Sequence, residues 1–177
     1  MGMRLDMNTK DIITERLVLK SMTLKDVEIA WELWGKEETA KYLVDPYYKD
    51  VEELRKLIVD IETWENEYPF IAYKKDTLEV VGTCSIGQEG RIGQWGPGYF
   101  LKKEMWGKGY GTEILKALIE FAYSLGIHDF QGSVANENIA SKRVMEKCGM
   151  KLDSESSFKK GGTNIIYPSS IYKLHLD

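Results

Sequence analysis

Three glycines alternate with larger residues in the stretch Met-Trp-Gly-Lys-Gly-Tyr-Gly-Thr at 105–112. Glycine has no Cβ to block a ligand, and it lets neighbouring backbone N–H groups converge on one point. An apolar helical pattern begins directly after the stretch, so the unpaired N–H groups and the positive dipole end of that helix would add to the same point. The sequence therefore predicts a turn that binds an anion, most simply a phosphate group.

Two well-known phosphate-binding patterns do not fit this turn. A P-loop needs Ser or Thr after its Gly-Lys pair, but Gly107-Lys108 is followed by Gly109, and Lys102 stands where the first glycine belongs. A dinucleotide-binding fingerprint counted from Gly107 and Gly109 needs a third glycine at the position of Thr112. The spacing thus disfavours a nucleotide-phosphate enzyme of either kind.

The turn lies between a predicted strand, which ends with the apolar run at 99–101, and a predicted helix. Apolar residues at spacings of three and four fall on one face of that helix. They are Ile114, Leu115, Leu118, Phe121, Ala122 and Leu125. A further strand is expected at 130–134, which makes one right-handed strand–helix–strand unit. Another helix follows at 138–148, and a hairpin at 150–158 and 165–176 closes the chain.

Residues 106–113 resemble the acetyl-CoA signature of the GNAT N-acetyltransferases, in the form found in the ribosomal-protein N-acetyltransferase (RimJ/RimL-type) subgroup. Thr-Glu-Arg-Leu-Val-Leu at 14–19 is similar to the first strand of that subgroup. Residues 136–141 and 146–150 are similar to its last-helix motif. One departure from the broad family, Trp106 in place of Arg or Gln, is usual in the subgroup. The resemblance covers nearly the whole chain and keeps the order of the motifs.

The resemblance implies an α/β (α+β) protein with the GNAT acyl-CoA N-acyltransferase fold. A central mixed, mostly antiparallel sheet of six to seven strands would be flanked by helices, with a splayed parallel strand pair holding CoA. We expect a flexible tail at 1–10 and a single domain at 11–177. The Gly96-Pro97-Gly98 trio should interrupt strand pairing, because proline lacks a ladder donor. It is a candidate for the bulge that the family carries next to the pantetheine arm.

The resemblance also assigns acetyl-CoA as cosubstrate. Its pyrophosphate would be held by Trp106, Gly107, Lys108, Gly109, Tyr110, Gly111 and Thr112. Tyr99, Phe100 and Leu101 would line the pantetheine arm, with a backbone N–H near Leu101 polarising the acetyl carbonyl. Asn138 would hydrogen-bond the cosubstrate, and Ser141 would protonate the departing thiolate. Two structural alternatives stay open: Asn136 or Asn138 caps the helix, and Ser141 bonds its own backbone.

The implied reaction is direct transfer of the acetyl group to a primary amine within a ternary complex. Neutralising a lysine amine at pH 7 costs about 4–5 kcal/mol, against about 1–1.5 kcal/mol for a protein α-amine. An α-amino acceptor therefore barely needs a base, and Glu89, Glu104 and Asp45 are candidates only by their position near the expected cleft. If Ser141 is not the acid, Tyr167 is the next residue to test. The alternative function is a CoA-binding sensor or interaction module without transferase activity.

The composition and charge of the chain disfavour several classes of binding partner. The chain has 177 residues and a net charge of −4, from 28 acidic and 24 basic residues, which disfavours nucleic-acid binding. No apolar run reaches membrane-spanning length, and the start does not read as a signal peptide, so we expect a cytoplasmic protein without a membrane partner. Cys84 and Cys148, with His128 and His175, lack metal-ligand spacing, so no metal is expected and both cysteines read as core residues. Five tryptophans and ten tyrosines leave room for a homodimer interface.

Overall fold

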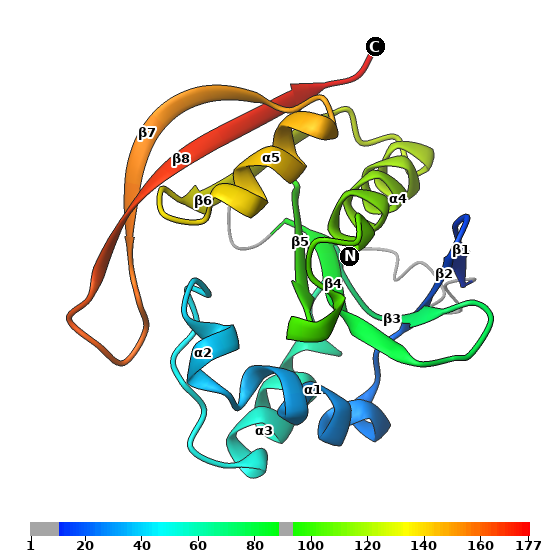
Figure 1. Ribbon diagram of the computed structural model, residues 1–177, viewed down its shortest axis with the longest axis vertical. Coiled ribbons are helices and arrows are strands. Elements are labelled where there is room, and N and C mark those ends of the chain that lie inside the picture. The colour runs from blue at the N-terminus through cyan, green and yellow to red at the C-terminus, as the bar shows by residue number, and fades with distance from the viewer. Residues whose placement is uncertain (1–10, 89–93) are drawn as a thin grey trace.

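The computed structural model describes residues 11–88 and 94–177, so the predicted tail at 1–10 lies outside the described residues. The chain forms two antiparallel sheets with helices on both faces (Figure 1). The first sheet has the order β1-β2-β3-β4-β5, with strands Ile12–Ile13, Leu17–Ser21, Glu67–Lys74, Val80–Gly87 and Gly96–Leu101. The second has the order β6-β8-β7, with strands Asp129–Ala135, Ile166–His175 and Lys151–Lys159.

The helices divide between the two faces of the first sheet. Helices α4 (Tyr110–Ser124) and α5 (Ile139–Lys147) belong to the larger apolar core, together with Phe70 and Ala72 of β3. Helices α1 (Val27–Trp34) and α3 (Val51–Ile61) pack with Ile71, which points to the opposite face because side chains alternate along a strand. The remaining helical segments are α2 (Glu37–Ala40), η1 (Leu24–Asp26) and η2 (Lys103–Met105).

The predicted central helix is confirmed as α4, and its apolar stripe explains why it folds there. Ile114, Leu115, Leu118 and Ala122 are all fully buried against the first sheet. Burying an isoleucine or leucine side chain contributes about 1.5–3 kcal/mol. The stripe therefore fixes the rotation of α4, and with it the direction in which the N-terminal turn of the helix points.

The predicted α/β class, with mostly antiparallel strands flanked by helices, is confirmed. The strands differ in one detail: the described part of the chain has eight of them in two sheets, where one sheet of six to seven was expected. One parallel bridge, Trp95 to Phe130, joins the sheets, and the Gln131 N–H donates to the Trp95 carbonyl at 2.8 Å. Beyond this bridge, β5 and β6 share no further pairing among the described residues. The splayed parallel pair that the resemblance implied is therefore confirmed.

The expectation that Gly96-Pro97-Gly98 interrupts pairing was wrong. The register between β4 and β5 runs without a shift from Gly87–Gly96 to Gly82–Leu101. The Lys102 N–H donates to the Val81 carbonyl at 3.0 Å. Because backbone groups alternate in direction along an antiparallel strand, the N–H and C=O groups of even-numbered β5 residues point toward β4. Those of odd-numbered residues point away from it. The missing donor of Pro97 thus falls on the side away from β4, where the ladder does not need it. The trio is not a bulge.

The tip of the β7–β8 hairpin is fastened by a fully buried lysine. Lys160 donates from Nζ to the backbone carbonyls of Ala40, Leu43 and Asp45 at 2.9, 2.9 and 2.6 Å. The ammonium also lies 4.3 Å from the centre of the Tyr47 ring. These contacts tie the second sheet to the segment between α2 and α3.

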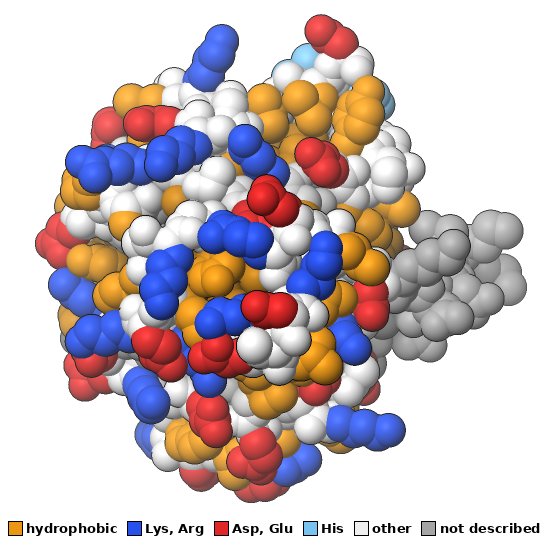
Figure 2. All heavy atoms as spheres, turned by 45° about the vertical axis from the view of Figure 1, so that its right-hand side comes forward, with side chains coloured by type: hydrophobic (Ala, Val, Ile, Leu, Met, Phe, Trp, Pro, Cys, Tyr) orange, Lys and Arg blue, Asp and Glu red, His pale blue; other side chains and the backbone are white. Residues whose placement is uncertain are grey.

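Within the described residues, no helix is both long and apolar enough to cross a membrane. On the face drawn in Figure 2, basic and acidic side chains are interspersed over the surface. That distribution fits the small net charge of the sequence.

Candidate active site

The glycine turn presents free backbone donors at the start of α4. Gly107 and Gly109 have φ values of 70° and 83°, which favour glycine, and Gly109 is the N-cap of the helix. The Glu113 N–H donates to the Gly109 carbonyl at 3.1 Å, so the three helical N–H groups before Glu113 have no acceptor inside the helix. Residues 106–109 are exposed. The turn can therefore bind an anion from solvent.

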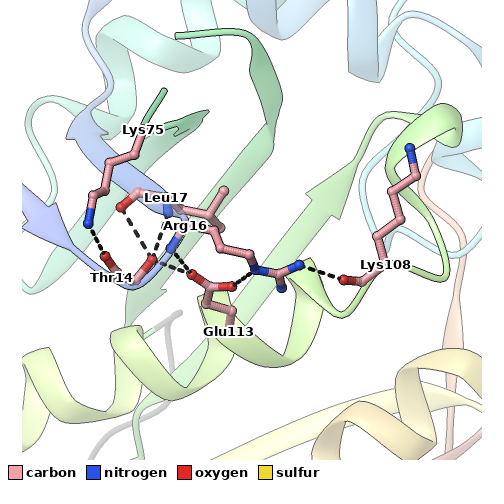
Figure 3. A network of polar contacts seen from close by, with 6 residues as sticks. All are labelled: Thr14, Arg16, Leu17, Lys75, Lys108 and Glu113. Atoms are coloured by element: carbon pink, nitrogen blue, oxygen red, sulfur yellow. Dashed lines mark hydrogen bonds and ion pairs between the residues drawn. The ribbon is translucent and has the colours of Figure 1, made fainter. Parts of the chain in front are cut away.

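A polar network fastens the turn to the segment before β2 (Figure 3). Arg16 donates from Nε to Glu113 Oε2 at 2.7 Å and from Nη1 to the Lys108 carbonyl at 2.9 Å. Glu113 Oε1 accepts from the Arg16 backbone N–H at 2.8 Å and from the Thr14 hydroxyl at 2.6 Å. The Arg16 guanidinium also stacks 4.4 Å from the centre of the Tyr110 ring.

The Glu113 carboxyl stays ionised inside this network. Burial alone would raise its pKa, but the hydrogen bonds from Thr14 and Arg16, with the charge of Arg16, outweigh burial and lower the pKa. An acidic side chain in the first turn stabilises the helix through the macrodipole. The same charge would repel an anion bound at that helix start unless a cation balances it.

Gly111 differs from the other two glycines of the turn because it lies against a side chain of β5. A Cβ added there would lie 3.0 to 3.3 Å from three atoms of the Tyr99 side chain. The absence of a side chain therefore lets the Tyr99 ring pack against the start of α4. The Tyr99 hydroxyl lies 3.1 Å from Ser141 Oγ, and burial raises the pKa of the Tyr99 phenol.

The structure shows the local partners of Asn138 and Ser141. Asn138 Oδ1 accepts the Ser141 N–H at 3.2 Å, so Asn138 is the N-cap of α5, as one of the structural alternatives stated. The Asn138 side-chain NH₂ is not used in this cap. The Ser141 hydroxyl bonds the Tyr99 phenol, so its described partner is not its own backbone.

The backbone of β5 faces two ways. Tyr99 and Leu101 are odd-numbered like Pro97, so their backbone N–H groups point away from β4. They point toward the space where β5 and β6 have separated. Phe100 directs its backbone toward β4, and its side chain is largely buried. The Leu101 carbonyl accepts from Trp106 Nε1 at 3.1 Å, which holds the half-exposed indole at the end of the strand.

The positions of the candidate general bases do not single out one residue. Glu104 is exposed on η2, and Asp45 is exposed with its carboxylate 3.5 Å from the Tyr48 hydroxyl. Glu89 lies outside the described residues. Tyr167 packs its ring against Tyr42 and Phe158, whereas the phenol beside Ser141 is that of Tyr99.

The two cysteines are core residues, as predicted. Cys84 is buried in the larger core, and Cys148 packs against that core, where burial raises the pKa of its thiol to about 11. The described residues contain no cluster of three or more His, Cys, Asp or Glu side chains that could hold a metal ion.

Three features of the candidate site escaped the sequence analysis: the Tyr99 hydroxyl as the partner of Ser141, and the side chains of Arg16 and Glu113. Both members of the Arg16–Glu113 ion pair stand inside segments that carry the family resemblance, at 14–19 and 106–113. A basic residue in one of these segments and an acidic residue in the other could have indicated the ion pair. No comparable signal existed for Tyr99.

Comparison with known proteins agrees with this geometry. Residues 16–151 match the family model described as the acetyltransferase (GNAT) domain. An uncharacterised N-acetyltransferase of Bacillus licheniformis, p20, is 31% identical over 92% of this chain and 96% of its own. The chain therefore belongs to the GNAT acetyltransferase family, and it is an acetyl-CoA-dependent acyltransferase.

Solved structures share the fold at low sequence identity. The spermidine N-acetyltransferase of Vibrio cholerae, solved with CoA and spermine, has a TM-score of 0.79 and 17% identity, over 90% of this chain and 95% of its own. A RimL ribosomal-protein α-N-acetyltransferase, solved with coenzyme A, has a TM-score of 0.77 and 19% identity, over 95% and 99%. These likenesses establish the fold but leave the acceptor open.

Proposed function

We propose that this enzyme acetylates a primary amine, either a protein N-terminal α-amine or a small-molecule amine, by direct attack on acetyl-CoA in a ternary complex. We place it in the RimJ/RimL-type subgroup on its three sequence motifs. Both acceptor kinds occur among the structural neighbours, in the RimL and spermidine enzymes. One observation carries the proposal: β5 brings the gap-facing N–H groups, the Tyr99–Ser141 pair and the following glycine turn together.

The cosubstrate would bind along this arrangement. The free N–H groups of residues 107–112 would hold the pyrophosphate, with Lys108 adding positive charge. The pantetheine arm would enter the space between β5 and β6. There the Leu101 N–H would donate to the acetyl carbonyl as negative charge develops on its oxygen. A donor fixed in this way contributes roughly 3–4 kcal/mol to the transition state.

The leaving thiolate would take its proton from Ser141. A CoA thiol has a pKa near that of cysteine, about 8.5, so the acid needs to contribute only modestly. Tyr99 lies 3.1 Å behind the serine and can resupply its proton. The Asn138 side-chain NH₂ remains available for the cosubstrate, because the cap of α5 uses only Oδ1.

The acceptor test measures CoA release across a panel of peptides with free N-termini, polyamines, amino acids and aminoglycosides. We expect turnover with one class of primary amine and none with its N-acetylated form. Binding of acetyl-CoA without turnover on any member would favour the sensor alternative instead.

The site assignment has its own test. Gly109→Ala should weaken CoA binding, measured by calorimetry, because a Cβ there disfavours the positive φ and lies 3.4 Å from Arg16 Nη2. Gly126→Ala is the matched control: Gly126 also has a positive φ, 85°, but lies beyond the other end of α4 with no neighbour within 4 Å. Equal CoA affinity in the two folded variants would contradict a pyrophosphate site at the turn.

A further inference from the structure

We propose that Arg16 is a positioning residue for acetyl-CoA, which it serves by aiming one peptide of the glycine turn and by balancing the charge of Glu113. The inference rests on the proposed pyrophosphate site at residues 107–112. Arg16 lies 92 positions before Lys108 and 97 before Glu113 in the sequence, yet it binds both. Figure 3 shows its guanidinium between the Glu113 carboxylate and the Lys108 carbonyl.

The first part of the argument concerns the Lys108–Gly109 peptide. In a trans peptide the carbonyl and the following N–H point in opposite directions. The 2.9 Å bond from Arg16 to the Lys108 carbonyl therefore turns the Gly109 N–H away from the network. Glycine accepts either sense of this peptide, since φ can take both signs. An outside anchor is needed to keep the carbonyl oxygen from facing a bound phosphate.

The second part concerns charge. Glu113 is ionised, only 15% of its side-chain surface is exposed, and it stands in the first turn of the helix that would bind the pyrophosphate. An uncompensated carboxylate there would oppose an anionic ligand. The Arg16 guanidinium pairs with it at 2.7 Å and cancels its charge. Glu113 and the stacked Tyr110 ring in turn hold the guanidinium against the turn.

A purely structural role makes a different prediction. If the ion pair only linked β2 to α4, then its loss would lower stability and affect all substrates alike. The proposed role affects only ligands that carry the pyrophosphate. S-Acetylpantetheine separates the two cases, because it offers the same thioester and pantetheine arm without that group.

The experiment compares Arg16→Met, Glu113→Gln and the double variant with the wild-type enzyme. For Arg16→Met we expect CoA affinity to fall about tenfold or more, as for a lost charge-assisted contact. The kcat/KM for S-acetylpantetheine should stay within about threefold of the wild-type value. The double variant should bind CoA more tightly than Arg16→Met, because it removes the unbalanced carboxylate.

Lys75→Met is the matched control. Lys75 lies beside this network and donates to the Thr14 carbonyl at 2.9 Å, but its described side-chain hydrogen bond reaches neither Lys108 nor Glu113. It removes the same formal charge, and CoA affinity should change by no more than about twofold. Weakening of CoA binding equal to that of Arg16→Met would reduce the effect to net charge and overturn the proposal.

Other results also decide the matter. The proposal fails if folded Arg16→Met keeps wild-type CoA affinity, or if S-acetylpantetheine loses as much kcat/KM as acetyl-CoA does. A double variant no better than Arg16→Met would remove the charge-balancing role. If Gly109→Ala weakens CoA binding while Arg16→Met does not, then only this inference fails. If Gly109→Ala behaves like Gly126→Ala, then the pyrophosphate site itself is wrong.

Discussion

Tyr99 and Ser141 share a hydrogen bond, so their contributions to turnover should not be independent. We expect Tyr99→Phe and Ser141→Ala each to lower kcat by about 100-fold, the low end for general acid catalysis. If both act on one proton path, the double variant should be little slower than the worse single variant. Steady-state kinetics on the accepted amine checks this, provided that chemistry limits turnover.

Tyr172→Phe is the control for the loss of a phenol in the same region. Its hydroxyl bonds Glu146 at 3.4 Å on the outer part of α5, and kcat should be unchanged. Multiplicative losses in the Tyr99/Ser141 double variant would show that the two hydroxyls act separately.

Glu113 makes the stability of the enzyme depend on pH. The pKa of Glu113 in the folded protein is below its ordinary value of 4.5, so the unfolded chain takes up this proton first as the pH falls. The stabilisation is therefore fully present above about pH 5, and it is lost as the pH falls through the lowered pKa. Urea unfolding of wild type and Glu113→Gln should show a free-energy difference that shrinks below pH 4.5. A difference that stayed constant down to pH 3 would contradict the network seen around this carboxylate.

At the scale of elements, the β7–β8 hairpin depends on Lys160. Lys160→Met would leave three backbone carbonyls without their donor, and we expect the free energy of unfolding to fall by about 2–4 kcal/mol. The neighbouring Lys159 is exposed, so Lys159→Met should change it by less than about 0.5 kcal/mol. Chemical denaturation of both variants makes the comparison, and equal effects would mean that the buried ammonium does not stabilise the fold.

The elements were predictable where one local pattern decided them. The apolar spacing of α4 and the glycines before it determine that helix without help from distant residues. The prediction that Gly96-Pro97-Gly98 interrupts strand pairing was wrong, because proline removes a hydrogen bond only when its nitrogen faces the partner strand. Which way Pro97 faces depends on the β4 register, and the sequence of β5 does not contain that register.

Some residues of the candidate site could likewise be predicted from local motifs, whereas others depend on how distant elements pack. The turn, Leu101 and Ser141 were named from motifs, and their positions in the structure are compatible with those roles. The Tyr99–Ser141 contact joins residues 42 positions apart, and it depends on how α5 packs beside α4. Gly111 was predicted to bind phosphate, and the structure adds that its missing Cβ makes room for the Tyr99 ring. Packing of this kind follows from the assembled fold.

At the scale of the whole molecule, one bridge joins the two sheets in the part of the chain that the structure describes, and the proposed acetyl-CoA site lies at that junction. The Tyr99 strand belongs to the first sheet, while Ser141 follows β6 of the second. The Tyr99–Ser141 bond and the packing of α4 against α5 therefore also hold the two halves in register.

The order of strands in the second sheet has a consequence for synthesis of the protein. Its middle strand, β8, comes after both of its neighbours in the sequence. Among the described residues, the only strand pairing that β6 makes apart from β8 is the bridge at Phe130. A ribosome adding about 5–20 residues per second needs roughly 2–6 s to pass from Ala135 to Ile166. Once Ser141 has been added, early in that interval, the growing chain carries both the turn and Ser141, but one wall of the proposed acetyl-CoA gap has no partner strand. The nascent enzyme should thus become competent only when β8 has emerged, after every residue of its proposed site has been made.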